Sequence, residues 1–248
     1  MKTPRTIERQ ITELNTLANL TDIYGEIAST RMKRTRQSVL TSRDFMAEVY
    51  DVFKEVFASY RAEVMRLVKS RGEDPALGVT LLSHNGKTVS LLLSANTGLY
   101  GEVVRRSFDL FMRDVRRSDV EVAIVGRVGR NYFLNDEPGR PYTYFELPDN
   151  GTDRERLSEL VRHLVQYEEI HVYFGQFQNV VSQEPTKMVI SAATLLTNLG
   201  AGSGEENKYI FEPTLERVLM FFETEIFASL LDQTVRESQL SKFASRIL

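Results

Sequence analysis

The 248-residue sequence contains no cysteine and no tryptophan, and only three histidines, His84, His163 and His171. Without thiols the chain has no disulfides, no thiolate zinc site and no cysteine nucleophile. Three scattered histidines are too few for a histidine-rich metal centre. We therefore expect neither a metal ion nor another cofactor.

Long apolar runs are also missing. Runs such as Leu91–Leu93 and Val122–Val125 are far shorter than the roughly 18 to 20 residues of a membrane-spanning helix. Residues 1–9 contain no apolar core of a secretory signal. With 42% apolar and 26% charged residues, the composition predicts a folded, soluble chain of one large or two small domains. We expect it in the cytoplasm.

Charge is unevenly distributed along the chain. The net charge is -3, yet residues 1–43 contain eight basic and four acidic side chains, a local balance of +4. The centre of this region is the cluster Arg31, Lys33, Arg34 and Arg36. No aromatic residues alternate with these cations as single-stranded nucleic acid binding requires. A solvated helix face and a surface for an acidic protein partner remain as two interpretations.

Residues 1–72 are poor in helix-breaking residues, since the only proline is Pro4 and the only internal glycine is Gly25. Apolar or small residues recur in steps of three and four, which predicts a long helix packed lengthwise on a partner, a coiled-coil shaft. The stripe is first narrow and then bulkier: Ile7, Ile11, Leu14, Ala18, Thr21, Gly25, Ala28 and Met32, followed by Phe45, Val49, Val52, Phe53, Val56, Tyr60, Val64 and Leu67.

Residues 73–198 change period and predict an α/β domain. Strands are expected at 79–82, 88–94, 120–125, 170–174 and 187–192, and helices at 102–117 and 153–167. Asn85-Gly86 predicts a hairpin between the first two strands. Residues 135–152 are expected to form a surface loop with an edge segment at 142–147. Alternating strands and helices imply a mainly parallel, Rossmann-like mixed sheet covered by helices.

The end of the chain returns to the spacing of a shaft. Residues 199–208 include the run Gly200-Ala201-Gly202-Ser203-Gly204 and predict a flexible linker. Residues 209–248 then repeat apolar residues in steps of three and four. We expect this last helix to pair antiparallel with the first one. The fold class is therefore an α/β domain flanked by two long terminal helices that form a coiled coil.

Candidate catalytic sites are weak. The loops Ser94–Gly101 and Gly126–Arg130 follow strands, but they lack the glycine spacing of a dinucleotide site and the lysine of a P-loop. We interpret both as tight turns. Asp153, Glu155, Glu168 and Glu169 lie near His171 in the sequence, but in so charged a stretch a solvated helix face is the preferred interpretation. We expect no catalytic residue.

Five local sequences, in this order, resemble the gamma subunit of F-type ATP synthases. Leu20–Arg34 is similar to the family pattern I-T-K-A-M-x-M-V-A-A-S-K-L-R-R, and Ser94–Gly101 to T-S-D-R-G-L-C-G. Ile124–Phe133 resembles I-G-x-K-G-x-x-F-F, and Tyr209–Pro213 resembles Y-x-x-E-P. Glu237–Ile247 resembles E-S-x-A-S-E-H-A-A-R-M. Together these motifs span nearly the whole chain.

The resemblance implies a non-catalytic rotor subunit that couples proton or sodium translocation to ATP synthesis or hydrolysis. Its partners would be the alpha and beta subunits of the catalytic ring, the epsilon subunit and the membrane c-ring, with the complex on the inner face of the cell membrane. The expected partner interface contains residues near the ring bore and residues facing acidic collar loops: Thr21, Ile23, Ile27, Arg31, Lys33, Arg34 and Arg36. A non-rotating adaptor and a small doubly wound enzyme are the alternatives.

The sequence also departs from these patterns. Asp22 replaces the usual lysine, Tyr24 the usual methionine, and Lys242-Phe243 the usual Glu-His. In addition, the last helix of the family normally continues for several tens of residues beyond the final motif, whereas this sequence ends at Leu248. We therefore expect a shortened shaft, in which the first turns of the N-terminal helix lack an intramolecular partner.

Overall fold

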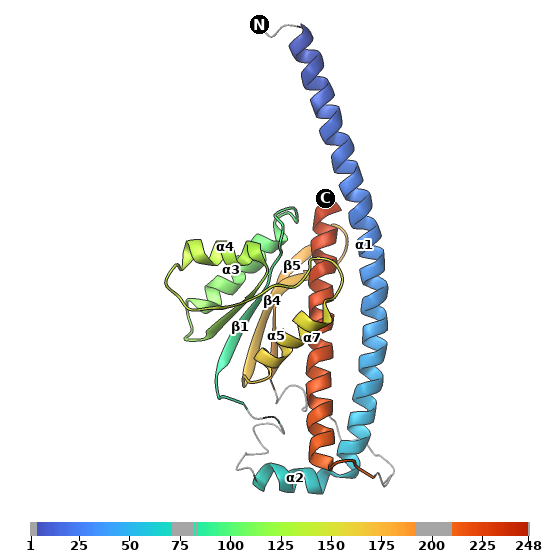
Figure 1. The fold of residues 1–248 in the computed structure, drawn as a ribbon, viewed down its shortest axis with the longest axis vertical. Coiled ribbons are helices and arrows are strands. Elements are labelled where there is room, and N and C mark those ends of the chain that lie inside the picture. The colour runs from blue at the N-terminus through green and yellow to red at the C-terminus, as the bar shows by residue number, and fades with distance from the viewer. Residues whose placement is uncertain (1–3, 71–81, 83, 192–209, 248) are drawn as a thin grey trace.

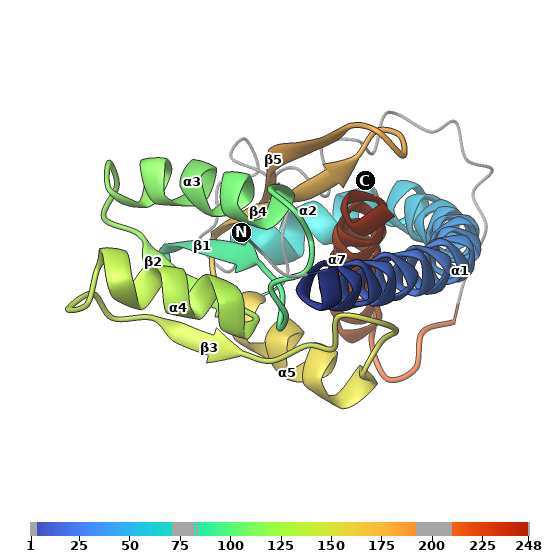
Figure 2. The same cartoon turned by 90° about the horizontal axis from the view of Figure 1, so that it is seen from above.

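The computed structural model describes residues 4–70, 82, 84–191 and 210–247. Two long helices, α1 (Pro4–Ser59) and α7 (Leu215–Ile247), lie side by side, and an α/β domain packs against α7 (Figures 1 and 2). The predicted linker 199–208 lies outside the described residues. The predicted division into segments 1–72, 73–198, 199–208 and 209–248 therefore stays a prediction.

The two long helices are antiparallel. Phe53 contacts Phe222 near the lower end of the pair, Ser38 hydrogen bonds to Arg236 in the middle, and Tyr24 lies against Arg246 near the upper end. Residue numbers thus rise on one helix as they fall on the other. The seam of α1 is buried or half-buried at intervals of three and four residues: Ala28, Met32, Thr35, Val39, Ser42, Met46, Val49, Phe53 and Val56. The predicted coiled-coil pairing is confirmed.

Phe45 and Val52, two residues of the bulkier stripe, do not lie on the seam as predicted, since both are about half exposed. The seam passes through their neighbours Met46 and Phe53 instead. The N-terminal part of α1 extends beyond the end of α7, and by helix rise α1 is about 84 Å long and α7 about 50 Å.

A break at Tyr60 separates α1 from the short helix α2 (Arg61–Ser70), which lies across the lower end of the shaft (Figure 1). No proline or glycine causes this turn. The Tyr60 ring packs edge-on against Phe211, and Val64 is fully buried with Phe53 and Leu219. Tertiary packing therefore overrides local helix propensity, and the expected long helix is divided in two at Tyr60.

The domain has a five-stranded sheet in the order β3-β2-β1-β4-β5. The first four positions are parallel, and β5 runs antiparallel to β4. The Rossmann-like mixed sheet is therefore confirmed. The remaining bounds are β1 (Thr88–Leu93), α3 (Val103–Val115), β2 (Glu121–Val125), α4 (Arg127–Asp136), β3 (Thr143–Phe145), α5 (Arg154–Leu164), β4 (Glu169–Phe177) and β5 (Gln183–Ser191).

The predicted hairpin around Asn85-Gly86 is wrong. Both edges of β1 are occupied, by β2 on one side and by β4 on the other, so no hairpin partner can pair with it. Residues 79–81 of the proposed partner strand lie outside the described residues. The Asn85 side chain instead accepts the backbone N–H of Lys87, a local turn that leads the chain into the sheet.

Three other differences concern single elements. Residues 127–136 form helix α4, which the sequence analysis did not predict, and β5 begins four residues earlier than expected. Gly126 has φ of +95°, so the tight exit from β2 inferred from its glycine is confirmed. Helix α7 begins at Leu215 rather than at residue 209, after Thr214, whose hydroxyl accepts the N–H of Arg217.

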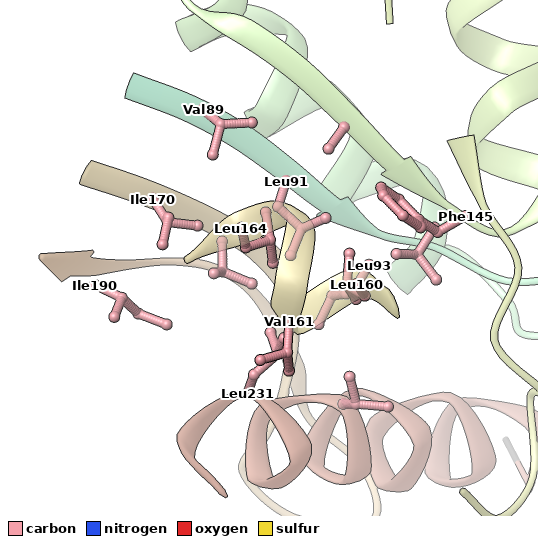
Figure 3. Packing of buried hydrophobic residues seen from close by; sticks show 14 of the residues in the cluster. Val89, Leu91, Leu93, Phe145, Leu160, Val161, Leu164, Ile170, Ile190 and Leu231 are labelled. Carbon is pink, nitrogen blue, oxygen red and sulfur yellow. The ribbon is translucent and has the colours of Figure 1, made fainter. Parts of the chain in front are cut away.

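Both faces of the sheet are covered, each by a separate apolar cluster. On one face, Leu92, Ile124 and Tyr173 pack against Phe108 of α3 and Phe133 of α4. On the other face, strand residues pack against α5 and against α7 (Figure 3). The contribution of α7 to this second cluster is Phe227, Leu231 and Val235. One helix therefore belongs to the shaft and to the core of the domain at once.

Replacing Leu231 with alanine should lower the free energy of unfolding by about 2 to 5 kcal/mol. Leu231 is fully buried between shaft and sheet, so the change leaves a cavity there. Leu17→Ala is the matched control, because Leu17 is 59% exposed and should change stability by no more than about 0.5 kcal/mol. Denaturant titration of the full chain measures both values. Equal losses in the two variants would contradict this account of the core.

Candidate functional site

The upper part of α1 carries an exposed apolar stripe. Its side chains project from the helix where no other described residue covers them, and Leu14 and Leu17 are the most exposed, at 64% and 59%. We call this surface the upper stripe; its residues are Ile7, Ile11, Leu14, Leu17, Leu20, Ile23 and Ile27. Apolar residues scattered singly on a surface are ordinary, but a continuous row along one helix indicates a binding surface.

The predicted interface residues lie at the lower end of this stripe. Ile23 and Ile27 belong to the stripe, and the exposed Thr21 donates its hydroxyl to the carbonyl of Leu17 within the helix. The basic cluster follows directly. Lys33, Arg34 and Arg36 are exposed and Arg31 is half-buried. Among the described residues, none of these four cations has a carboxylate within ion-pair distance.

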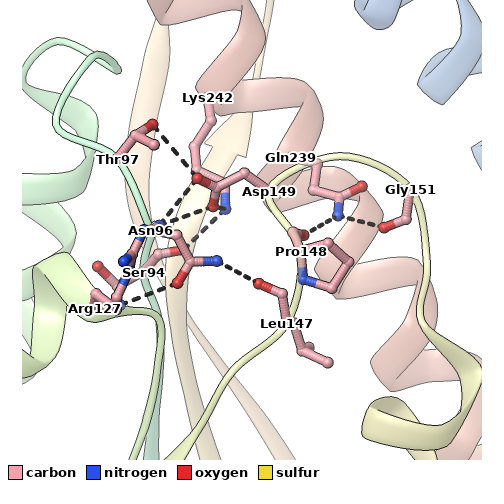
Figure 4. A network of polar contacts seen from close by, with 10 residues as sticks. All are labelled: Ser94, Asn96, Thr97, Arg127, Leu147, Pro148, Asp149, Gly151, Gln239 and Lys242. Carbon is pink, nitrogen blue, oxygen red and sulfur yellow. Dashed lines mark hydrogen bonds and ion pairs between the residues drawn. The ribbon is translucent and has the colours of Figure 1, made fainter.

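A second candidate site, which is polar, lies where the last turns of α7 meet the loops at the carboxyl edge of the sheet. We call it the shaft–domain joint; the side chains that α7 contributes are Gln239, Lys242, Ser245 and Arg246 (Figure 4 shows part of it). Each lies three or four residues from another of the four, so they share one face of the helix. All four donate hydrogen bonds to backbone carbonyls of the α/β domain.

Gln239 and Lys242 bind two different loops. The Gln239 amide donates to the carbonyls of Pro148 and Gly151, at 2.9 and 2.8 Å. The Lys242 ammonium donates to the carbonyl of Ser94 at 2.9 Å and lies 3.5 Å from the Asp149 carboxylate. Thus α7 holds the loop after β1 and the loop after β3 together.

The Lys242 and Asp149 side chains are 8% and 13% exposed, so this is a buried ion pair. Asp149 is held by more than Lys242. Both of its oxygens accept the backbone N–H of Asn96, each at 3.0 Å. Burial lowers the pKa of the Lys242 ammonium, and the nearby Asp149 carboxylate opposes that shift. A buried charge pair needs such additional hydrogen bonds to offset its desolvation.

An aromatic clasp completes the joint. The Arg246 guanidinium lies 4.6 Å from the centre of the Tyr100 ring and 5.7 Å from that of Tyr24, and its Nε donates to the carbonyl of Leu99 at 3.0 Å. Phe243 is fully buried and packs edge-on against Tyr100. Burial raises the pKa of the Tyr100 hydroxyl. The clasp therefore connects α1, α7 and the loop after β1.

Hydrogen bonds of the joint also involve the loops Ser94–Gly101 and Gly126–Arg130, which follow β1 and β2. In open α/β sheets the loops at the carboxyl ends of the strands are where ligands bind. Here Asp149 accepts the N–H of Asn96, and the Asn96 side chain accepts the N–H of Arg127 at 3.2 Å. The backbone N–H groups of Asn96 and Arg127 are therefore already hydrogen bonded to side chains of the same chain. This arrangement agrees with the interpretation of the two loops as tight turns.

The histidine candidates do not come together as a site. His171 is bonded to Glu169, whereas Asp153 caps α5 by accepting the N–H of Arg156. Asp153 precedes the first turn of α5, whereas Glu169 begins β4, five residues after that helix ends. Within the described residues no group of three or more metal-ligating side chains gathers. None of the described helices is both long and apolar enough to span a membrane.

A family model described as ATP synthase matches residues 3–248, nearly the entire chain. The chain belongs to the gamma-subunit family of F-type ATP synthases. Its relatives include the ATP synthase gamma chain of Desulforamulus reducens, which is 23% identical over 96% of this chain and 83% of the relative. The gamma chain of Roseiflexus sp. is 24% identical over 99% of this chain and 86% of the relative. The resemblance based on the five sequence motifs is confirmed.

The fold also has a counterpart among solved structures. A solved structure described as the central stalk and c-ring of the Tetrahymena thermophila mitochondrial ATP synthase matches with a TM-score of 0.62. The match covers 92% of this chain and 96% of that chain at 18% identity. The gamma-type chain therefore has the central-stalk fold of a rotary ATP synthase.

Sequence reasoning missed most of the joint. It noted Lys242 as a departure from the family pattern but gave it no role, and it did not single out Asp149 or Gln239. A signal was present, because Gln239, Lys242 and Arg246 interrupt an apolar helix at spacings of three and four. Polar residues on one face of a buried helix indicate a polar partner, but the partner loop lies about 90 residues away in the sequence.

Gly101→Ala should destabilise the joint. Gly101 has φ of +57°, and a Cβ built there would lie 2.6 Å from the Ser245 hydroxyl oxygen. We expect a loss of about 1 to 3 kcal/mol in the free energy of unfolding. Gly98→Ala in the same loop is the control, since a Cβ there meets nothing within 4 Å. Thermal or denaturant unfolding compares the two variants, and equal stability would show that α7 does not press on this loop.

Proposed function

We propose that this gamma-type chain is the non-catalytic rotor of a rotary ATP synthase. The upper stripe turns inside the bore of the ring of alpha and beta subunits. The α/β domain and α2 lie between that ring and the membrane, where the epsilon subunit and the c-ring bind. Torque then passes through the chain between ion flow and ATP synthesis or hydrolysis. The chain is cytoplasmic and is held peripherally on the inner face of the cell membrane through the complex.

The observation that carries this proposal is the upper stripe. Seven large apolar side chains follow one another along a single helix, and each is at least 38% exposed. A continuous row of this kind is costly in water and is stabilised when another protein surface covers it. An apolar sleeve formed by ring subunits is a suitable cover, because it excludes water while still permitting rotation.

The basic cluster supports the same placement. Its four cations lack acidic partners within the described chain and follow directly below the upper stripe on α1. This position corresponds to the mouth of the ring, where acidic collar loops would complement the charge. Exposed pairs of this kind favour correct association more than they add affinity. They also keep the contact loose enough to slide.

The absence of cysteine allows a direct test of rotation. A thiol introduced by Ser118→Cys, an exposed position after α3, would be the only one in the chain and could carry a bead or dye. The chain is coexpressed with the ring subunits, and the purified complex is attached to a surface through the ring. ATP-driven rotation of the label is the expected result. A complex that hydrolyses ATP without rotation would indicate the adaptor alternative, and a chain that never enters the complex would overturn the proposal.

Neutralising part of the basic cluster should weaken assembly. We expect Arg34→Gln with Arg36→Gln to reduce affinity for the ring by about 2- to 30-fold, at roughly 0.2 to 1 kcal/mol for each exposed pair. The effect should diminish with added salt. Arg113→Gln with Arg117→Gln removes the same charge from two exposed positions, one in the last turn of α3 and one just after that helix, and serves as the control. Titration of labelled chain into ring subunits at two ionic strengths measures both, and identical behaviour of the two pairs would argue against the cluster.

A further inference from the structure

The shaft–domain joint occupies a mechanically special position. The start of β1 and the end of β5 lie at the same end of the sheet, because Thr88 and Ser191 both pair with Glu169. The loop after β1 meets the last turns of α7 at the opposite, upper end. Helix α7 therefore begins at the lower end. Both covalent connections between the domain and the shaft helices therefore join the lower end. At the upper end the attachment is noncovalent. Between the two ends the domain packs on Phe227, Leu231 and Val235 of α7, and the joint is what keeps its upper end against the shaft.

The charges at the joint are arranged differently from the family patterns given above. Those patterns have an arginine on the loop after β1 and a glutamate on the last helix. Thr97 and Lys242 occupy these positions in the gamma-type chain, and Asn96 stands at the aspartate of the same loop pattern. The loop after β1 has therefore lost one charge of each sign, and the helix has a cation in place of an anion. Asp149, on the loop after β3, supplies the matching anion and lies within 3.5 Å of both Thr97 and Lys242.

Other departures from the family patterns meet at the same place. Tyr24 stands at a methionine position, Tyr100 at a cysteine position and Phe243 at a histidine position. Tyr24 and Tyr100 lie against Arg246, and Phe243 packs on Tyr100. Substitutions that are far apart in the sequence thus contact one another in space.

We propose that Lys242 and Asp149 form a charge lock that fixes the upper end of the α/β domain to the shaft, with a cation on α7 where the family pattern has an anion. Both are positioning residues. Lys242 ties α7 to the loop after β1 through the Ser94 carbonyl, and Asp149 ties the loop after β3 to the same place through the Asn96 N–H. Removing either partner leaves the other as a buried, uncompensated charge, which opens the joint to water.

Amide hydrogen exchange on the isolated full-length chain tests the lock. In Lys242→Met and in Asp149→Asn, the Asn96 amide should exchange at least about tenfold faster, while the Leu91 amide in the centre of the sheet keeps its protection. Lys87→Met is the matched control, because it removes an ion pair of 2.7 Å, with Glu121, on the exposed surface of the same domain. Unchanged exchange at Asn96, or an equal loss of protection at Leu91, would overturn the proposal.

The sign of the charge is tested separately. Lys242→Glu restores the residue of the family pattern but places a second carboxylate against Asp149, so Asn96 should exchange faster in this variant than in Lys242→Met. Adding Asp149→Asn to Lys242→Glu should restore part of the protection. If Lys242→Glu is tolerated as well as Lys242→Met, the lock does not depend on charge and the proposal fails.

The consequence for coupling rests on the proposed function. In the assembled membrane complex, Lys242→Met should retain ATP hydrolysis but reduce ATP-driven ion pumping severalfold, because a tilting domain takes up rotation that the c-ring should receive. If pumping is unchanged although Asn96 exchanges faster, the lock is not used in torque transmission. If the unsubstituted chain supports no pumping at all, the rotor proposal fails while the exchange result stands.

Discussion

Burial of helix α7 on two sides is the constraint on which the structure depends. One side packs along α1 as half of the shaft, and the other inserts Phe227, Leu231 and Val235 into the core beneath the sheet. The hydrophobic effect thus joins a rod and an α/β domain through one shared element. Because the same helix serves both, the domain cannot turn independently of the shaft without exposing its own core.

The long helices and most strands could be predicted from the sequence because their signals are local. Apolar steps of three and four located α1 and α7, and the runs around Leu91, Val122 and Val172 located buried strands. The predictions failed where distant contacts decide the outcome. The break at Tyr60 follows from packing on Phe211, and no turn residue marks it. The expected hairpin at Asn85-Gly86 failed because β2 and β4, far along the chain, occupy both edges of β1.

The two functional surfaces also differ in how far the sequence predicts them. The upper stripe and the basic cluster are continuous in sequence, so composition and spacing were enough to single out Ile23, Ile27 and their basic neighbours. The joint is assembled from four separate segments, and its buried lysine resembles an ordinary helix residue when taken alone. Family patterns marked Lys242 as unusual, but only the structure brings Asp149 to it. Comparison of a sequence with its family indicates which residues are unusual, and the fold shows which of them contact one another.

The crosswise helix α2 has a mechanical consequence. Its ten residues extend about 15 Å sideways at the foot of the shaft, anchored by the burial of Val64 against Leu219. A bare coiled coil offers a gripping surface only close to its axis, where a given turning moment requires a large tangential force. A sideways foot increases the radius at which that force acts, so a structure that holds the chain at α2 drives it with less load on each contact.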